Sequence, residues 1–254
     1  MCLILFAHGA HPDYPLVIAA NRDEYYQRPS AKAAFWQDHP HILAGRDLEG
    51  MGTWLGVTRT GRFAALTNFR DPNERKTDAP TRGQLVSGFL TSERKPRAYL
   101  EDVAALAPNY NGFSLLAGDI DGVFFFSSRA SSVQQVSPGI HGLSNHLLDT
   151  PWPKVTRGKL RLHAALADEP SPEALLDLLN DREPAADHEL PDTGIGTEME
   201  RVLSPALIVS TQYGTRASTA VLIGRDGGVS FSERTILRGG DIGATVSLRF
   251  RLER

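Results

Sequence analysis

The strands and helices that this sequence predicts come in groups, and the order of those groups limits the possible folds more than any other feature. Short apolar runs predict strands at Cys2–His8 and Leu16–Asn21, joined by a turn. A glycine-rich stretch, Gly50–Gly56, leads into a further strand through Val57, and Arg62–Asn68 follows as another. The first quarter of the chain is therefore expected to be mainly β.

Two pairs of helices interrupt the strands. Apolar residues at helical spacing predict one pair at Arg82–Leu90, with Thr81 as its N-cap, and Pro96–Leu106. The second pair is predicted at Pro153–Ala167 and Pro172–Leu179, where each helix has a proline at its first turn. Paired helices suggest that each pair forms one covering layer.

Further strands are predicted between and after the helix pairs. They are Asn111–Gly118, Gly122–Ser128, Ser137–Asn145, Ala206–Ser210, Ser218–Ile223, Val229–Glu233 and Thr245–Arg251. Tyr25–Pro40 is polar, aromatic and proline-containing, and it is predicted to be a surface loop. Asn180–Glu200 is acidic and contains prolines and glycines, which predicts the most flexible stretch of the chain.

This order favours an α+β fold in which two stacked sheets carry helices on their outer faces. A doubly wound parallel sheet needs strands and helices that alternate one by one, and this chain does not show that pattern. No internal repeat and no linker divides the sequence, so residues 1–254 are expected to form a single domain.

The composition is that of an ordinary soluble globular protein. Apolar residues make up 41% of the chain and charged residues 22%, and the net charge is −3. This balance, without a basic stripe, argues against a nucleic-acid partner. No run approaches the roughly 20 apolar residues that a membrane span needs. The start lacks the basic region of a signal peptide, so we expect a cytoplasmic protein.

Cys2 is the only cysteine of the chain, and it becomes the N-terminal residue if the initiator methionine is removed. An α-amine titrates near neutrality and can accept the thiol proton, so this one residue would hold both a nucleophile and a base. The pattern predicts an N-terminal-nucleophile (Ntn) hydrolase site. A small apolar residue at the start of an edge strand explains the same placement about as well.

Polar residues follow the second predicted strand, and a hairpin would bring them close to Cys2. They are Asn21, Arg22, Asp23 and Glu24. An arginine beside a thiolate lowers its pKa, and an aspartate near the α-amine can orient it. A solvated turn after a strand would also produce such a tetrapeptide.

Other polar residues lie where strands end or begin. Asn68 and Asn145 each end a predicted strand, where a side-chain amide can donate to a developing oxyanion. Arg216 precedes a strand and can bind a carboxylate or phosphate, and Trp54 lies in a glycine-rich region that can line a cleft. Capping asparagines and a surface arginine are the simpler interpretation of each residue taken alone.

No metal site is expected. His8 with His11, and His39 with His41, are closely spaced, but no cysteine or regular carboxylate pattern completes a set of ligands.

Taken together, these segments resemble the NRDE family, also called the transport and Golgi organisation protein 2 family, which is named for the tetrapeptide at Asn21–Glu24. The matching segments are Met1-Cys2, Ala20–Tyr25, Arg28–Ser30, Gly52–Gly56, Ala65–Asn68, Arg82-Gly83, Tyr110–Phe113, Gly142–Asn145, Thr150–Trp152, Leu203-Ser204, Tyr213–Arg216 and Phe231–Arg234. They run nearly from end to end of the chain.

The resemblance implies a four-layer αββα sandwich, the Ntn-hydrolase fold, related to the branch of penicillin V acylase and bile salt hydrolase. By that resemblance Cys2, Arg22, Asp23 and Asn145 would be catalytic, and Asn21, Trp54, Asn68 and Arg216 would bind the substrate. Arg22 and Asp23 are adjacent here, whereas the acylases separate the corresponding residues.

Two functions stay open from the sequence. The first is a cysteine amidohydrolase that cleaves a linear amide or acyl bond and requires no cofactor. The second is a non-catalytic or weakly catalytic protein that carries haem or an acyl-lipid on the same scaffold. The family is associated with haem trafficking, lipid metabolism and secretory organisation, and a scaffold without a small ligand is a third option. The oligomeric state is open.

Overall fold

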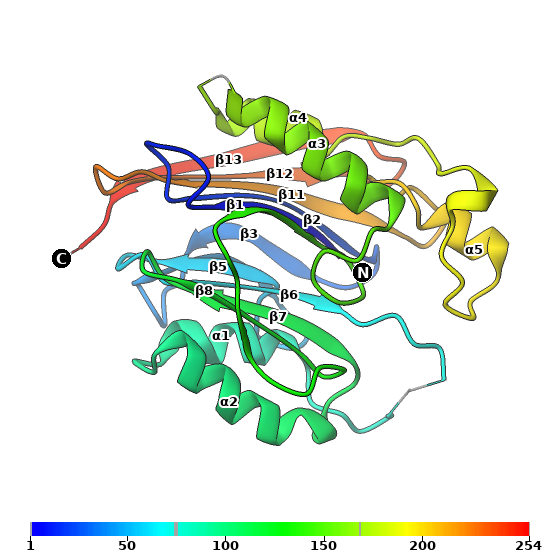
Figure 1. The fold of residues 1–254 in the computed structure, drawn as a ribbon, viewed down its shortest axis with the longest axis horizontal. Helices are drawn as coiled ribbons and strands as arrows, with labels where there is room; N and C mark the ends of the chain where they lie inside the picture. Colours follow the sequence, from blue (N-terminus) through cyan, green and yellow to red (C-terminus); the bar gives the residue numbers. More distant parts are fainter. Residues whose placement is uncertain (1, 74–75, 168, 254) are drawn as a thin grey trace.

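Two β-sheets lie face to face in the computed structural model, and each sheet is covered on its outer face by a pair of helices (Figure 1). The structure describes residues 2–73, 76–167 and 169–253. The layers run in the order helices, sheet, sheet, helices, so the predicted α+β sandwich of two antiparallel sheets is confirmed.

The first sheet has six strands, and β1 and β2 lie within it. Its order is β10-β1-β2-β11-β12-β13, and all of its pairings are antiparallel. The strands are β1 (Cys2–His8), β2 (Leu16–Tyr25), β10 (Gly139–Leu143), β11 (Tyr213–Ile223), β12 (Gly228–Ile236) and β13 (Ile242–Arg251). β1 therefore lies inside the sheet, with a neighbouring strand on each side.

The second sheet has seven strands in the order β3-β4-β5-β6-β7-β8-β9. They are β3 (Ser30–Phe35), β4 (Ile42–Asp47), β5 (Leu55–Thr58), β6 (Phe63–Asn68), β7 (Phe113–Gly118), β8 (Val123–Ser127) and β9 (Gln134–Gln135). Each strand pairs with its neighbours in sequence. The connection from β6 to β7 carries α1 and α2, and the other connections are shorter.

The helices form the outer layers. α1 (Gly83–Thr91) and α2 (Pro96–Leu106) pack on the second sheet, and α3 (Pro153–Ala167) and α4 (Pro172–Leu178) pack on the first. The remaining helical segments are α5 (Thr197–Val202) and two 3₁₀ turns, Ala107–Asn109 and Asp187–Glu189. None of the described helices is long and apolar enough to cross a membrane.

The alternation of side chains along a strand divides the core into layers. In β1, Ile4 and Phe6 point towards the second sheet, whereas Leu3 and Leu5 point towards α3 and α4. A third cluster fills the space between the second sheet and α1 and α2. Because Cys2 has the same parity as Ile4, its side chain faces the space between the sheets.

Several predictions of secondary structure are wrong. The expected loop over 25–40 contains β3, an edge strand of mostly small and exposed residues that gives little apolar signal. The strand expected at Ala206–Ser210 is absent from the described structure, because Ile208 bonds back to Thr215 at the start of β11. Thr81 does not cap α1, since the N-cap position is Arg82. The segment 180–200, expected to be the most flexible stretch, contains a 3₁₀ turn and the start of α5, and its flexibility stays a prediction.

Candidate active site

Cys2 and Arg22 are directly opposite each other on β1 and β2. Both side chains face the second sheet, and both line a cavity of about 300 Å³. Burial raises the pKa of the Cys2 thiol, whereas a hydrogen bond from the Asp23 backbone and the charge of Arg22 oppose that rise. The hairpin predicted from the sequence therefore brings the thiol and the arginine into one cavity.

Both sheets and the start of α1 contribute to this cavity. Its lining includes Cys2, Arg22, Asp23 and Glu24 from the first sheet, Asp47, Trp54 and Asn68 from the second sheet and its loops, and Arg82 and Gly83 at the start of α1. Most of these side chains are polar or charged. The cavity therefore suits a polar group at the position that a reacting bond would occupy beside the thiol.

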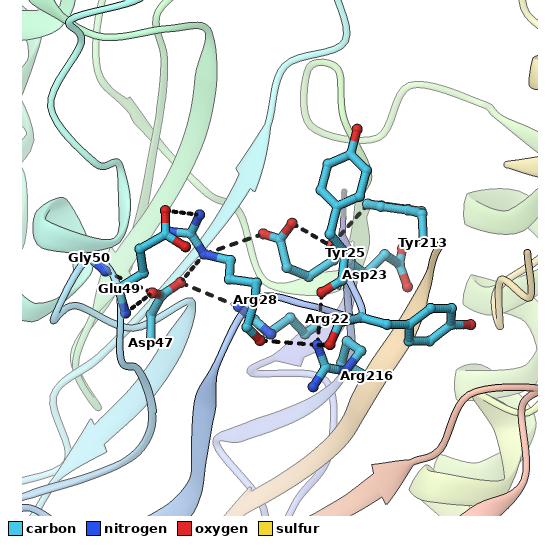
Figure 2. Close-up of polar contacts among 11 residues, drawn as sticks. Arg22, Asp23, Tyr25, Arg28, Asp47, Glu49, Gly50, Tyr213 and Arg216 are labelled. Carbon is cyan, nitrogen blue, oxygen red and sulfur yellow. Dashed lines mark hydrogen bonds and ion pairs between the residues drawn. The ribbon is translucent and has the colours of Figure 1, made fainter. Parts of the chain in front are cut away.

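A network of charged side chains forms one wall (Figure 2). Asp47 accepts hydrogen bonds from Arg22 at 3.3 Å and from Arg28 at 2.6 Å, and Arg28 also approaches Glu24 and Glu49. Burial alone would raise the pKa of Asp47, but the bonds from Arg28 and from two backbone N–H groups hold it below its usual range. The charges of Arg22 and Arg28 are thus largely balanced within the protein.

Trp54 supports Arg22 from the other side. The Arg22 guanidinium lies over the Trp54 ring, 4.3 Å from its centroid, and only 4% of Arg22 is exposed. A Cβ atom at position 45 would come within 2.4 Å of the ring, so Gly45 is what lets the indole lie there. The structure thus gives Trp54 a defined place in the cavity wall.

Asp23 has the opposite orientation from Arg22, because successive residues of β2 alternate between the two faces of the sheet. Its carboxylate accepts a hydrogen bond from the Thr215 hydroxyl at 2.7 Å, and the Tyr213 hydroxyl donates to its backbone oxygen at 2.9 Å. Burial raises the pKa of Asp23, and the positive charge of Lys154 acts against that rise.

Lys154 is a buried cation that sequence analysis did not single out. It lies at the start of α3 with 3% of its surface exposed, and its ammonium donates to the backbone oxygen of Leu203 at 3.0 Å. Burial lowers its pKa to about 8, and Asp23 opposes that change. Its position in the second place of a polar-faced helix gives no sequence signal for burial.

Asn145 and Asn68 come together from different sheets. Asn145 follows β10, is fully buried and has a φ of 51°, a left-handed conformation that asparagine tolerates better than most residues. Its side-chain amide donates to the backbone oxygen of Asn68 at 2.9 Å. Only Asn68 lines the cavity, and its side chain forms no hydrogen bond with the described residues. Asn68 therefore brings a side-chain amide, without a hydrogen bond to any described residue, to the cavity that Cys2 also lines.

The structure does not place Asn21 and Arg216 in the cavity lining. The Asn21 amide donates to the backbone oxygens of Leu179 and Ala206 and accepts from Ser218, so it joins β2 to the outer layer. Arg216 lies at a bulge in β11 and donates to three backbone oxygens in the segment 25–28. Both residues support the segment that carries Arg22 and Arg28. Among the described residues, no cluster of His, Cys, Asp or Glu can hold a metal ion.

Comparison with known sequences agrees with the resemblance. The sequence model of the family "Transport and Golgi organisation 2" matches residues 1–238. The Transport and Golgi organization 2 homolog of Mus musculus is 39% identical over 263 residues, which cover 93% of this chain and 94% of the mouse protein. The Drosophila melanogaster protein of that name is 28% identical over 268 residues, which cover 93% and 92%.

Two solved structures share the fold. A C2A mutant of conjugated bile acid hydrolase from Clostridium perfringens aligns over 98% of this chain and 92% of its own, with a TM-score of 0.53 and 9% identity. An N-acylethanolamine-hydrolyzing acid amidase ortholog from Caenorhabditis elegans aligns over 87% and 92%, with a TM-score of 0.50 and 8% identity. Both neighbours have the Ntn-hydrolase fold, which confirms the fold predicted from the sequence.

Proposed function

The chain belongs to the Transport and Golgi organisation 2 family, and we propose that it is an amidohydrolase with Cys2 as its nucleophile. The observation that carries the proposal is the position of Cys2, at the start of a strand within the sheet, opposite Arg22 and in a polar cavity. The substrate is a small molecule with a linear amide or related acyl bond. Two structural neighbours whose names describe a hydrolase and an amidase support this choice.

The reaction requires removal of the initiator methionine, which makes the amine of Cys2 available as a base. The amine accepts the thiol proton, and the sulfur attacks the carbonyl carbon of the amide. The tetrahedral intermediate then collapses to a thioester. The amide nitrogen of the substrate takes the proton from the α-ammonium group of Cys2 and leaves as an amine. Water then attacks the thioester with the same α-amine as base, which releases the acid and restores the thiol.

Three groups assist these steps. The side-chain amide of Asn68 donates to the oxyanion of the tetrahedral intermediate, and Asn145 fixes the backbone that carries it. Arg22 stabilises the thiolate across the strand pair. Asp23, held by Thr215, orients and balances the charge of the α-amine when it is protonated. A reducing compartment keeps a lone thiol active, so a cytoplasmic location suits this chemistry.

A test begins with the intact mass of the protein from its native host. Loss of one methionine exposes the Cys2 amine, and a retained methionine leaves the thiol without its base. Turnover of a panel of acyl amides is then compared for the wild type, Cys2→Ser and Cys2→Ala. We expect iodoacetamide to label the wild type once and to abolish turnover. Turnover that survives Cys2→Ala contradicts the proposal.

A second candidate function is transport of haem or an acyl-lipid without chemistry. The observation that favours it is a groove of about 780 Å³ beside the cavity, lined in part by Tyr25, Met199, Val202 and Leu203. Titration with haem and extraction of lipids from the purified protein test this function. Saturable binding of either ligand together with a complete absence of turnover would favour it over the amidohydrolase.

A further inference from the structure

Arg82 differs from the other two arginines that line the cavity. Arg22 and Arg28 both pair with Asp47, and Arg28 also approaches two glutamates. Arg82 donates one hydrogen bond to the backbone oxygen of Gly112 at 3.0 Å. Among the described residues, no carboxylate lies within ion-pair distance of Arg82. Its positive charge is therefore left for something that enters the cavity.

The surroundings of Arg82 also favour an anion. Gly83, the first residue of α1, lines the same cavity, and the first turn of this helix has no acidic side chain and no capping side chain. The N-terminal end of a helix carries a partial positive charge. In α1 the N–H groups of Gln84 and Leu85 already donate to the backbone oxygens of Thr81 and Arg82, so the helix contributes mainly this partial charge. The loop at Gly52 packs closely against Gly83 and so holds this end of the helix in place. Only glycine allows this approach, since a Cβ atom at position 52 would lie 2.4 Å from the Gly83 carbonyl carbon.

Burial increases the benefit of an anionic ligand. Desolvation lowers the pKa of Arg82, and the charges of Glu24 and Cys2 act against that change. Glu24 approaches Arg28 at 3.9 Å, and among the described residues no ion pair joins Glu24 to Arg82. Arg82 is partly buried, and a partly buried cation without a carboxylate partner gains more from a bound anion than a fully exposed arginine does.

Arg82 lies at a junction of three spaces. Together with Asn68 it lines the Cys2 cavity, the groove of about 780 Å³ and a third groove of about 500 Å³. The grooves add apolar side chains, among them Tyr25, Met199 and Leu203. A ligand that reaches both the thiol and a groove must therefore pass the guanidinium of Arg82.

We propose that Arg82 and the N-terminus of α1 bind an anionic group of the substrate, a carboxylate, sulfonate or phosphate within a few bonds of the scissile amide. The apolar part of the same molecule lies in the groove of Tyr25, Met199 and Leu203. The substrate class is thus an amphipathic amide with an acidic group. This inference rests on the proposed amidohydrolase function and narrows its substrates.

The experiment compares two probes of matched length, N-octanoyltaurine, which is anionic, and N-octanoylethanolamine, which is neutral. Calorimetry measures their binding to Cys2→Ala protein, in which no hydrolysis can occur. We expect the anionic probe to bind roughly 10- to 100-fold more tightly, which is the range for hydrogen bonds to charged groups. The variant Arg82→Gln should remove that preference, and Arg82→Lys should keep part of it.

Arg97 provides a matched control, because it is an exposed arginine on α2 outside the cavity lining. Arg97→Gln should leave the preference unchanged. The preference between probes is a ratio, so a general loss of stability in Arg82→Gln does not change it. Equal binding of both probes, or a preference that survives Arg82→Gln, overturns the anion site.

Failure of the two proposals can be told apart. If the anionic probe binds through Arg82 but the wild-type enzyme hydrolyses neither probe, the anion site stands and the amidohydrolase function for such amides falls. If the wild type hydrolyses both probes at rates that Arg82→Gln lowers equally or not at all, the amidohydrolase function stands and the anion site falls.

Discussion

The side-chain amide of Asn145 donates to the backbone oxygen of Asn68 at 2.9 Å, and this bond joins the ends of two strands from different sheets. Asn68 lines the cavity with a side chain that has no hydrogen-bond partner among the described residues, whereas Asn145 is fully buried behind it. The two asparagines therefore have different roles. In the proposed reaction Asn68 would act on the substrate, and Asn145 would hold Asn68 in place.

Substitution separates these roles. Asn68→Ala should lower kcat by about 10²- to 10³-fold, the effect of losing one oxyanion donor, with little change in melting temperature. Asn145→Ala should lower stability by about 1–3 kcal/mol, because a buried backbone oxygen loses its donor and alanine disfavours the left-handed φ. Asn145→Gly also loses the hydrogen bond but avoids the φ penalty, so its stability should lie between those of the wild type and Asn145→Ala. Equal effects of the two alanine variants on melting temperature would contradict this division.

The charge of Arg22 should control the reactivity of Cys2. Burial raises the pKa of the thiol, and Arg22 lowers it from the adjacent strand. In Arg22→Gln, alkylation by iodoacetamide at pH 7 should slow by about 3- to 10-fold, and the midpoint of its pH profile should move upward. Arg22→Lys keeps the charge and serves as the control. Because the chain has one cysteine, the rate can be measured by intact mass. Unchanged profiles would show that Arg22 does not act on the thiol.

Lys154 should set the pH at which Asp23 ionises. Burial raises the pKa of Asp23, and the positive charge of Lys154 acts against that rise. Removing this charge in Lys154→Met raises the pKa of Asp23 further, so the acidic limb of the kcat/KM profile should move to higher pH. The variant Lys154→Met/Asp23→Asn should lack that shifted limb. A profile that keeps its shape in the single variant argues against any coupling between these two groups.

The buried pair of Arg70 and Glu200 should dominate the stability of the region beside the site. Their side chains are in direct contact and only 5% and 2% exposed, and Glu200 also accepts two bonds from Thr193. Arg70→Met leaves a buried carboxylate without its cation and should cost about 3–5 kcal/mol in urea unfolding. The double variant Arg70→Met/Glu200→Gln should recover part of this loss. A double variant less stable than Arg70→Met would contradict the charge-pair explanation.

The sequence was sufficient for the layers of this fold but not for the orientation of its polar residues. Paired helices between strand groups led to the correct sandwich, since apolar periodicity records which face of an element is buried. The same periodicity does not identify β3, because an edge strand of small residues has one weakly buried face.

The candidate site shows the same limit. The predicted hairpin brings Cys2 and Arg22 opposite each other, and Trp54 lines a cavity as expected. Asn68 lines the same cavity, and its substrate-binding role stays a prediction. Asn21 points away from the cavity because it shares the face of β2 with Val17 and Ala19, which pack on the outer layer. The burial of Lys154 and the lack of a carboxylate partner for Arg82 among the described residues could not be predicted from the sequence. Both properties depend on segments that are distant along the chain.

Glu233 should contribute less to the stability of the protein as the pH rises towards neutrality. This carboxyl is 4% exposed between the sheets, accepts a bond from the Ala33 backbone at 2.7 Å and feels the charge of Arg22. Burial raises its pKa from 4.5 to about 7. The folded state therefore binds more protons at Glu233 than the unfolded state between these values, so the contribution of Glu233 to stability is largest below about pH 4.5 and is lost up to about pH 7.

The size of this effect and its test follow from the same shift. Integration over the interval gives up to about 3 kcal/mol. Glu233→Gln keeps the shape of the side chain and cannot ionise. The difference in unfolding free energy between Glu233→Gln and the wild type should therefore move in favour of the variant between pH 5 and pH 8, while contributions from all other groups cancel. Urea unfolding at both pH values measures this difference. Parallel stability curves for the two proteins would mean that Glu233 ionises as readily when folded as when unfolded.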